Sequence, residues 1–186
     1  MTKFLKELDK VEVVLIGGCS GTGKSTLANI LCNRYGFHHR LGSGFIREIC
    51  RSFISTEENE YLHAYSYETG LDYSGYDLLT KQSEPMVRPI EMCIDRAVKE
   101  GTKIVVEGVN ILPKLYSHME GILGIILENK SETLHRNMCK GESHRLREFN
   151  EGQFKNTREI QKSFIEDAIV SDWSIVQTAS ISKGGI

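Results

Sequence analysis

The sequence has few of the features that mark membrane, secreted or zinc-binding proteins. No apolar run approaches the roughly 20 residues that cross a bilayer, and charges interrupt the first ten residues, where a signal peptide needs an apolar core. The five cysteines are odd in number and never stand at C-x-x-C spacing, and the histidines show no metal-ligand spacing. We therefore expect a cytoplasmic protein with reduced thiols, no membrane segment and no zinc site.

The chain also lacks a large charge excess and any repeat or linker that would mark a domain boundary. Its net charge of −2 over 186 residues gives no overall attraction to nucleic acid. Apolar residues make up 40% and charged residues 26%, as in soluble globular proteins. Because no repeat, low-complexity tract or linker divides the sequence, we expect a single domain over residues 1–186.

Short apolar runs alternate with helical patterns along the chain. The runs predict five strands, at residues 11–16, 37–41, 103–107, 122–127 and 174–177. Helical periodicity predicts the main helices at residues 23–35, 45–54, 78–98 and 153–169. Such alternation favours an α/β fold, with a mostly parallel five-stranded sheet and helices on both faces.

Three local signals refine this assignment. A four-residue spacing of apolar side chains indicates the second helix, at Phe45, Ile49 and Phe53. Ser55 and Glu58 have the spacing of a capping box and predict the start of a further helix. Pro85 and Pro89 predict a kink in the long helix or its division into two.

The most specific motif lies between the first predicted strand and helix. Residues 18–25 read Gly-Cys-Ser-Gly-Thr-Gly-Lys-Ser and match G-x-x-x-x-G-K-[ST], the phosphate-binding P-loop. Glycines let the backbone N–H groups surround an anion, and the positive helix end points at the same phosphate. The motif predicts ATP and Mg²⁺ as ligands, with Lys24 on the outer phosphates and the Ser25 hydroxyl on the metal. The predicted nucleotide-binding residues are Gly18, Ser20, Gly21, Thr22, Gly23, Lys24, Ser25 and Thr26.

P-loops occur in several functional classes, and the rest of the chain favours a kinase. A GTPase has D-x-x-G after its third strand, where this chain has Glu107-Gly108-Val109-Asn110. Residues 129–132 resemble the base-reading motif N-K-x-D but end in Glu132, and a helix cap explains them. A motor ATPase needs a longer chain. The length and a late arginine-bearing polar segment favour a small-molecule kinase, with a small lid at about residues 136–150.

Four stretches together carry a family resemblance, at residues 16–28, 45–48 with Arg51, 66–68, and 106–109 with Pro113. In their order they resemble the 2-phosphoglycerate kinase family of P-loop kinases, and residues 158–161 are loosely similar. The resemblance implies a three-layer P-loop fold and transfer of the γ-phosphate of ATP to a hydroxyl of a small, 2-phosphoglycerate-like anion. Gly44 stands where the family has Asp, and Asn110 where it tends to have His. The acceptor side therefore departs from the family pattern.

The remaining roles follow from residue type and position. The candidate catalytic residues are Lys24, Glu107, Arg145 and Arg147. Because Gly44 has no carboxylate, Glu107 is the candidate base, or a magnesium ligand through water; an ion pair with a neighbouring cation is the alternative. The candidate acceptor-binding residues are Arg47, Arg51, Glu68 and Asn110. Surface salt bridges are the alternative for the arginines.

Two further functions stay open at this point. A P-loop kinase acting on a hydroxyl of nucleic acid or a modified base would use the tyrosine-rich residues 61–76 to stack bases, although the near-neutral charge opposes it. A non-catalytic nucleotide-binding regulator would explain the missing acid at Gly44. Nothing in the sequence indicates the oligomeric state.

Overall fold

The computed structural model describes residues 8–64, 75–140 and 150–182. At its centre lies a five-stranded sheet in the order β2-β3-β1-β4-β5. Each neighbouring pair is parallel, so the sheet is parallel throughout where the sequence predicted a mostly parallel one. The strands are β1 (Val13–Gly17), β2 (His39–Gly42), β3 (Ile104–Glu107), β4 (Ile122–Glu128) and β5 (Ser174–Gln177). The predicted α/β fold with five strands is confirmed.

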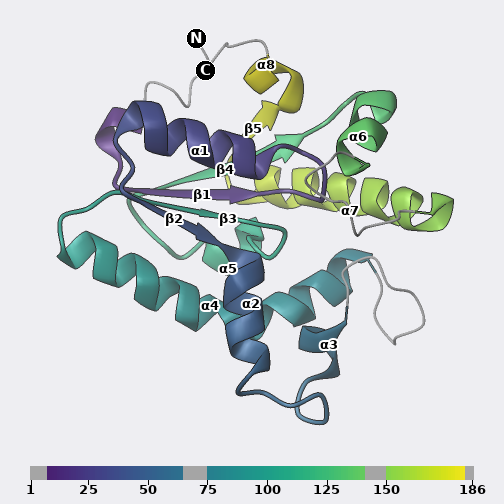
Figure 1. Ribbon diagram of the computed structural model, residues 1–186, viewed down its shortest axis with the longest axis horizontal. Helices are drawn as coiled ribbons and strands as arrows, with labels where there is room; N and C mark the ends of the chain where they lie inside the picture. The colour runs from purple at the N-terminus through teal and green to yellow at the C-terminus, as the bar shows by residue number, and fades with distance from the viewer. Residues whose placement is uncertain (1–7, 65–74, 141–149, 183–186) are drawn as a thin grey trace.

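Helices cover both faces of the sheet. Figure 1 shows α1 and α8 on one side and α4 and α5 on the other. The helices on the α1 side are α1 (Lys24–Tyr35) and α8 (Thr178–Ser182). The others are α2 (Ser43–Arg51), α3 (Glu60–His63), α4 (Gly75–Lys99), α5 (Pro113–Tyr116), α6 (Glu132–Cys139) and α7 (Glu151–Val170), and a short 3₁₀ helix η2 spans Leu8–Lys10. Among the described residues, no helix combines the length and the apolar character needed to cross a membrane.

β1 is buried on both faces, as the apolar run that encodes it predicts. Because side chains alternate along a strand, Val14 and Ile16 pack in the core beneath α1, whereas Val13 and Leu15 pack in the core shared with α2 and α4. Burial on two faces fixes the register of β1. It thereby fixes the point where the chain leaves the sheet and the phosphate loop begins.

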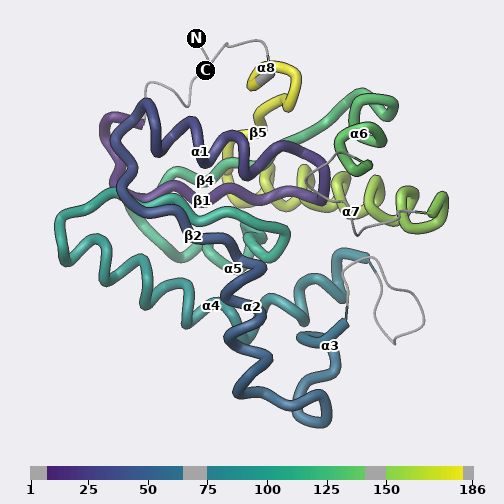
Figure 2. The backbone as a smooth tube through the Cα atoms, viewed as in Figure 1, coloured from purple at the N-terminus to yellow at the C-terminus, as the bar shows by residue number. Residues whose placement is uncertain are grey.

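Helix α4 agrees with the first of the two alternatives predicted from its prolines, a kink, and not with the second, a division into two helices (Figure 2). It runs from Gly75 to Lys99 as a single helix that contains Pro85 and Pro89, so the prolines do not divide it. They stand four residues apart, so their missing N–H groups fall on one side of the helix. The buried face carries Met86, Ile90 and Ile94, whose packing holds the helix together across the proline turns. Figure 2 shows the backbone of α4 changing direction near its middle.

Helix α2 confirms the helix predicted at residues 45–54, whereas the turn after it corrects a prediction. Its buried residues are Ser43, Ile46 and Cys50, whereas the apolar side chains that predicted the helix are solvent-exposed: Phe45, Ile49 and Phe53. The capping-box bonds between Ser55 and Glu58 do form, at 2.8 and 3.3 Å. They close a turn rather than starting a helix; α3 begins only at Glu60, where the Asn59 side chain accepts the Leu62 N–H.

Trp173 packs directly on Gly124 of β4, so a Cβ added at Gly124 would overlap the indole ring. We expect Gly124→Ala to lower the free energy of unfolding by about 1–3 kcal/mol, because an overpacked core must shift. Gly44→Ala is the matched control, since a Cβ there meets nothing within 4 Å and alanine favours a helix. Urea unfolding of both variants measures the difference; equal stability would contradict this packing account.

Candidate active site

The phosphate loop lies between β1 and α1, at the carboxyl edge of the sheet where α/β proteins bind their ligands. Gly18, Gly21 and Gly23 have φ angles of 132°, 74° and 87°, in the region that favours glycine. A Cβ at Gly21 would also lie 2.6 Å from the Cys139 sulfur. Backbone shape thus requires all three glycines, and close packing requires Gly18 and Gly21 in addition.

The loop carbonyls are held by side chains from within the loop and beyond it. Lys24 Nζ and Thr22 Oγ1 donate to the Cys19 carbonyl at 2.6 and 2.9 Å. Thr178, at the start of α8, donates to the carbonyls of Thr22 and Glu128 at 2.8 and 3.1 Å. The Lys24 side chain is therefore folded back over its own loop in this conformation.

Ser25 and Glu107 meet, as the sequence predicts for a metal-binding serine and an acid at the end of the third strand. Ser25 Oγ donates to Glu107 Oε1 at 2.9 Å, and Arg40 forms an ion pair with the same oxygen at 2.7 Å. Arg40 also donates to Asn29 of α1 at 2.8 Å. Glu107 thus forms the ion pair that was the alternative for this residue, and it keeps its contact with Ser25 at the same time. Arg40 escaped the sequence analysis, although its place in the predicted second strand beside the third was an available signal.

Helix α6 holds the loop from the other side. His135 Nε2 lies 2.7 Å from the Ser20 carbonyl, and Arg158 NH1 lies 3.3 Å from His135 Nδ1. An arginine only donates and a carbonyl only accepts, so these partners select the neutral tautomer protonated at Nε2. Burial, aided by the charges of Arg158 and Lys24, lowers the pKa of His135; the Ser20 bond alone would raise it. No sequence motif singles out His135.

Beneath the loop, Cys19 is buried against α7. Its sulfur lies 3.8 Å from Gln161 Oε1, and Gln161 is also bonded to the backbone N–H and carbonyl of Asn129, at 2.9 and 3.2 Å. Arg158 donates to the same Asn129 carbonyl at 2.6 Å. Burial raises the pKa of the Cys19 thiol to about 12, so the thiol stays neutral at physiological pH. Cys19 packs as a small loop filler.

A second polar cluster follows β3. Asn110 is 1% exposed and donates to Gln82 Oε1 and Ser83 Oγ of α4 at 2.9 and 3.0 Å. It accepts from Ser43 Oγ of α2 at 3.3 Å. A Cβ at Gly108 would overlap the Ser43 hydroxyl, so glycine is required there. This cluster joins the segment after Glu107 to both α2 and α4; Ser43 and Gln82 escaped the sequence analysis.

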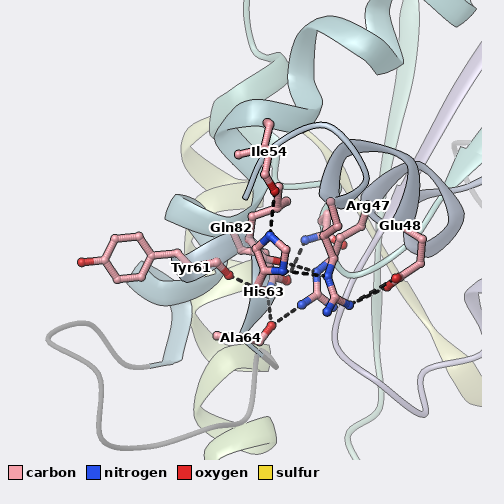
Figure 3. A network of polar contacts seen from close by, with 10 residues as sticks. Arg47, Glu48, Ile54, Tyr61, His63, Ala64 and Gln82 are labelled. Carbon is pink, nitrogen blue, oxygen red and sulfur yellow. Dashed lines mark hydrogen bonds and ion pairs between the residues drawn. The ribbon is translucent and has the colours of Figure 1, made fainter. Parts of the chain in front are cut away.

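Arg47 lies beside His63 and Ala64 at the end of α3, as Figure 3 shows, and Arg51 contacts His63. Arg47 donates to the carbonyls of Leu62, at 2.8 Å, and Ala64. Gln82 donates to the Ala64 carbonyl as well, at 2.6 Å. Arg51 pairs with Glu48 at 2.9 Å and donates to His63 Nδ1 at 3.3 Å. Both arginines have partners within the chain, and their roles toward an acceptor stay predictions.

The other predicted site residues divide into two groups. Gly44 lies in the first turn of α2, where nothing within 4 Å would obstruct a side chain. Glu68, Arg145 and Arg147 lie outside the described residues, as does most of the predicted lid at 136–150.

Oxygen ligands suit Mg²⁺, which is commonly held by one or two protein oxygens together with phosphates and water. The Ser25 hydroxyl and the Glu107 carboxylate supply such oxygens side by side. In the part of the chain that the structure describes, no group of three or more His, Cys, Asp or Glu side chains is arranged to hold a metal. The donor set therefore fits a phosphate-bound Mg²⁺.

Comparison with curated proteins finds relatives that are named 2-phosphoglycerate kinase. A 2-phosphoglycerate kinase of Methanococcus maripaludis strain C7 is 31% identical over 92% of this chain, and one of Methanopyrus kandleri is 28% identical over 96%. The resemblance to this family is thus confirmed. The alignments cover 61% and 60% of the two relatives, so this chain spans about three fifths of their length. No family model matches the chain.

Solved structures show the same fold. A sugar kinase of Janibacter sp. HTCC2649 superposes with a TM-score of 0.57 at 14% identity, covering 94% of this chain and 92% of its own. Shikimate kinase of Acinetobacter baumannii superposes with a TM-score of 0.51 at 10% identity, covering 92% and 86%. The architecture is therefore that of P-loop kinases.

The contact between His135 and Ser20 predicts a pH dependence of stability. Because the folded state lowers the pKa of His135, the unfolded chain binds its proton first as pH falls. Stability from this residue is complete above its usual pKa of about 6.5 and declines below it, by at most about 1.4 kcal/mol per pH unit. We expect the stability difference between wild type and His135→Gln to shrink from pH 8 to pH 5. Urea unfolding measures it.

The exposed His39 supplies the control, because His39→Gln should leave the pH dependence of wild type unchanged. A parallel pH dependence in wild type and His135→Gln would show that the neutral imidazole does not hold the loop.

Proposed function

We propose that this protein is an ATP-dependent phosphotransferase that moves the γ-phosphate to a hydroxyl of a small anionic metabolite resembling 2-phosphoglycerate. The observation that carries the proposal is the contact between Ser25 and Glu107 at the carboxyl edge of the sheet, beside the phosphate loop that contains Lys24. The names of the relatives and the P-loop kinase architecture support it.

The half of the site that would bind ATP, which we call the donor half, would work by positioning the phosphates and neutralising their charge. The loop N–H groups and the start of α1 surround the β-phosphate, and Lys24 exchanges the Cys19 carbonyl for phosphate oxygens. Ser25 and Glu107 would hold Mg²⁺, which neutralises charge on the phosphates when bound. Arg40 holds Glu107 through Oε1, and so keeps the carboxylate beside Ser25.

On the acceptor half, we propose that Gly44, Arg51 and Asn110 line or border the acceptor site, with Glu68 as a further polar contact. Asn110 acts through the Ser43 and Gln82 contacts, which set the distance between α2 and the segment after β3. Arg47, bonded to two backbone carbonyls, acts by positioning α3. Arg145 and Arg147 are proposed to meet the transferred phosphoryl group.

The direct test is ADP release with ATP and Mg²⁺ over a panel of glycerate esters, sugars, nucleosides and oligonucleotides. We expect stimulation by 2-phosphoglycerate or a related hydroxylated anion. Stimulation by oligonucleotides alone would favour a nucleic-acid acceptor. Tight ATP binding without any phosphorylated product would favour a nucleotide-binding regulator.

Lys24→Ala tests the donor half. We expect kcat/KM to fall by at least about tenfold, because a charge-assisted hydrogen bond contributes roughly 1.5–3 kcal/mol and each 1.4 kcal/mol is tenfold. The exposed Lys99, at the end of α4, provides the control variant Lys99→Ala, which should keep wild-type activity. Unchanged turnover in Lys24→Ala would defeat the catalytic role of the loop.

Glu107→Gln separates the two roles predicted for this acid. It keeps the shape of the side chain but removes its charge beside Ser25, so we expect the Mg²⁺ concentration for half-maximal activity to rise. A loss of about 100-fold or more in kcat that persists at saturating Mg²⁺ would identify Glu107 as the base. Glu100→Gln, in the turn directly after α4, is the control. Wild-type kinetics in Glu107→Gln would exclude both roles.

A further inference from the structure

Glu107 is a buried acid with a cation beside it. Its side chain is only 8% exposed, and Arg40 NH2 lies 2.7 Å from its Oε1 atom. Ser25 Oγ donates to the same oxygen at 2.9 Å. A carboxylate withdrawn from water is tolerated when it is paired and hydrogen-bonded, and removing one partner of a buried ion pair is costly. The chain therefore balances the charge of Glu107 with a group of its own.

The sheet and α1 together fix the position of that cation. On β2, Arg40 stands level with Val105 of β3, two residues before the point that is level with Glu107. Val105 packs in the core beneath α1. Arg40 turns to the same side, where its NH1 atom donates to Asn29 of α1 at 2.8 Å. The guanidinium is thus held at two nitrogens, one by α1 and the other by Glu107, so the fold defines its place beside the acid.

A metal ion at Glu107 would lie close to Arg40. In the proposed function, on which this inference rests, Ser25 and Glu107 hold Mg²⁺. The contacts of Glu107 with Ser25 and with Arg40 share the Oε1 atom. A divalent cation between Ser25 and Glu107 therefore meets the repulsion of a nearby guanidinium, and partial burial leaves that repulsion poorly screened. To bind, the cation must displace Arg40 or overcome this repulsion.

Of the two partners in this ion pair, Arg40 is the one that can withdraw. Its side chain is 36% exposed, against 8% for Glu107. A guanidinium is weakly hydrated and always charged, so it remains a cation when it turns toward solvent. The phosphates of a nucleotide bring several negative charges to the loop, and Mg²⁺ binds such oxygens together with one or two protein groups. The balance between Arg40 and Mg²⁺ at Glu107 therefore depends on whether phosphates are present.

We infer that Arg40 is a counter-cation that keeps divalent cations off Glu107 until phosphates are present, so that Mg²⁺ enters this site together with a nucleotide. Arg40 acts through Glu107 and is therefore a positioning residue. It holds the acid beside Ser25 and balances its charge until the metal ion takes over that charge.

Urea unfolding of the nucleotide-free protein, with and without Mg²⁺ at matched ionic strength, tests this role. Arg40→Gln should be less stable than wild type without Mg²⁺, because the buried carboxylate of Glu107 loses its counter-charge. About 10 mM Mg²⁺ should raise the folding equilibrium constant of Arg40→Gln about tenfold, as a dissociation constant near 1 mM gives, and that of wild type less than about twofold. Mg²⁺ that stabilises both proteins equally, or that leaves Arg40→Gln unchanged, would overturn the inference.

Three further variants separate charge from shape. Arg40→Lys keeps the positive charge and should respond to Mg²⁺ like wild type. Arg40→Gln/Glu107→Gln removes both charges, so Mg²⁺ should no longer stabilise it; a response in this double variant would place the metal elsewhere and overturn the inference. Arg96→Gln, which breaks the exposed ion pair with Glu100, is the matched control and should behave like wild type. An Arg40→Gln chain that folds only with Mg²⁺ supports the inference, whereas one that folds in neither condition contradicts it.

Equilibrium dialysis with Mn²⁺ distinguishes a failure of this inference from a failure of the proposed function. Wild type should retain Mn²⁺ only when a non-hydrolysable ATP analogue is present, whereas Arg40→Gln should retain it with and without the analogue. Equal retention by both proteins without the analogue would contradict the inference. A wild-type protein that retains no analogue would contradict the proposed function, while Mn²⁺ retention by Arg40→Gln alone would still show that Arg40 excludes the cation.

Discussion

The phosphate loop can turn its N–H groups toward an anion only if its carbonyl groups point away and find donors there. The structure supplies those donors from three places. Lys24 and Thr22 serve the Cys19 carbonyl from within the motif, His135 of α6 serves the Ser20 carbonyl, and Thr178 of α8 serves the Thr22 carbonyl. Segments more than a hundred residues apart in the chain thus meet to give one loop its shape. The positions of α6 and α8 next to β1 bring these donors to the loop.

The two halves of the site are built differently. On the donor side, backbone groups provide the chemistry and side chains stabilise the backbone. On the proposed acceptor side, Asn110 and Gln82 form a polar chain that ends on the Ala64 carbonyl, where Arg47 also donates. That chain connects β3 to α2, α3 and α4. A displacement at the end of β3 would therefore shift the helices that border the proposed acceptor site.

The sequence predicted the order of elements and the donor motif because both depend on local patterns. The five apolar runs coincide with the five strands, and β5 matches its predicted bounds. A local signal misled where it was taken as the start of a helix: the bonds between Ser55 and Glu58 close a turn, and α3 begins only at Glu60. The prolines of α4 left a kink and a division open, and packing of Met86 and Ile90 keeps α4 a single helix. His135 could not be recognised as a site residue, since its importance comes from a partner distant in sequence. For Arg40 the only signal was its place in the predicted second strand.

The bond between Lys24 and the Cys19 carbonyl has a consequence for selectivity. Since the ammonium group already has an internal partner, an incoming ligand contributes only the difference between its own attraction and that of a carbonyl dipole. A neutral nucleoside offers no such difference, whereas the multiply charged end of a triphosphate offers a large one. In the proposed function, the Cys19 carbonyl would thereby set a threshold of negative charge, below which a ligand fails to release the lysine. Lys24 would thus discriminate between ligands by their charge, before contacts with the rest of the loop discriminate between them by shape.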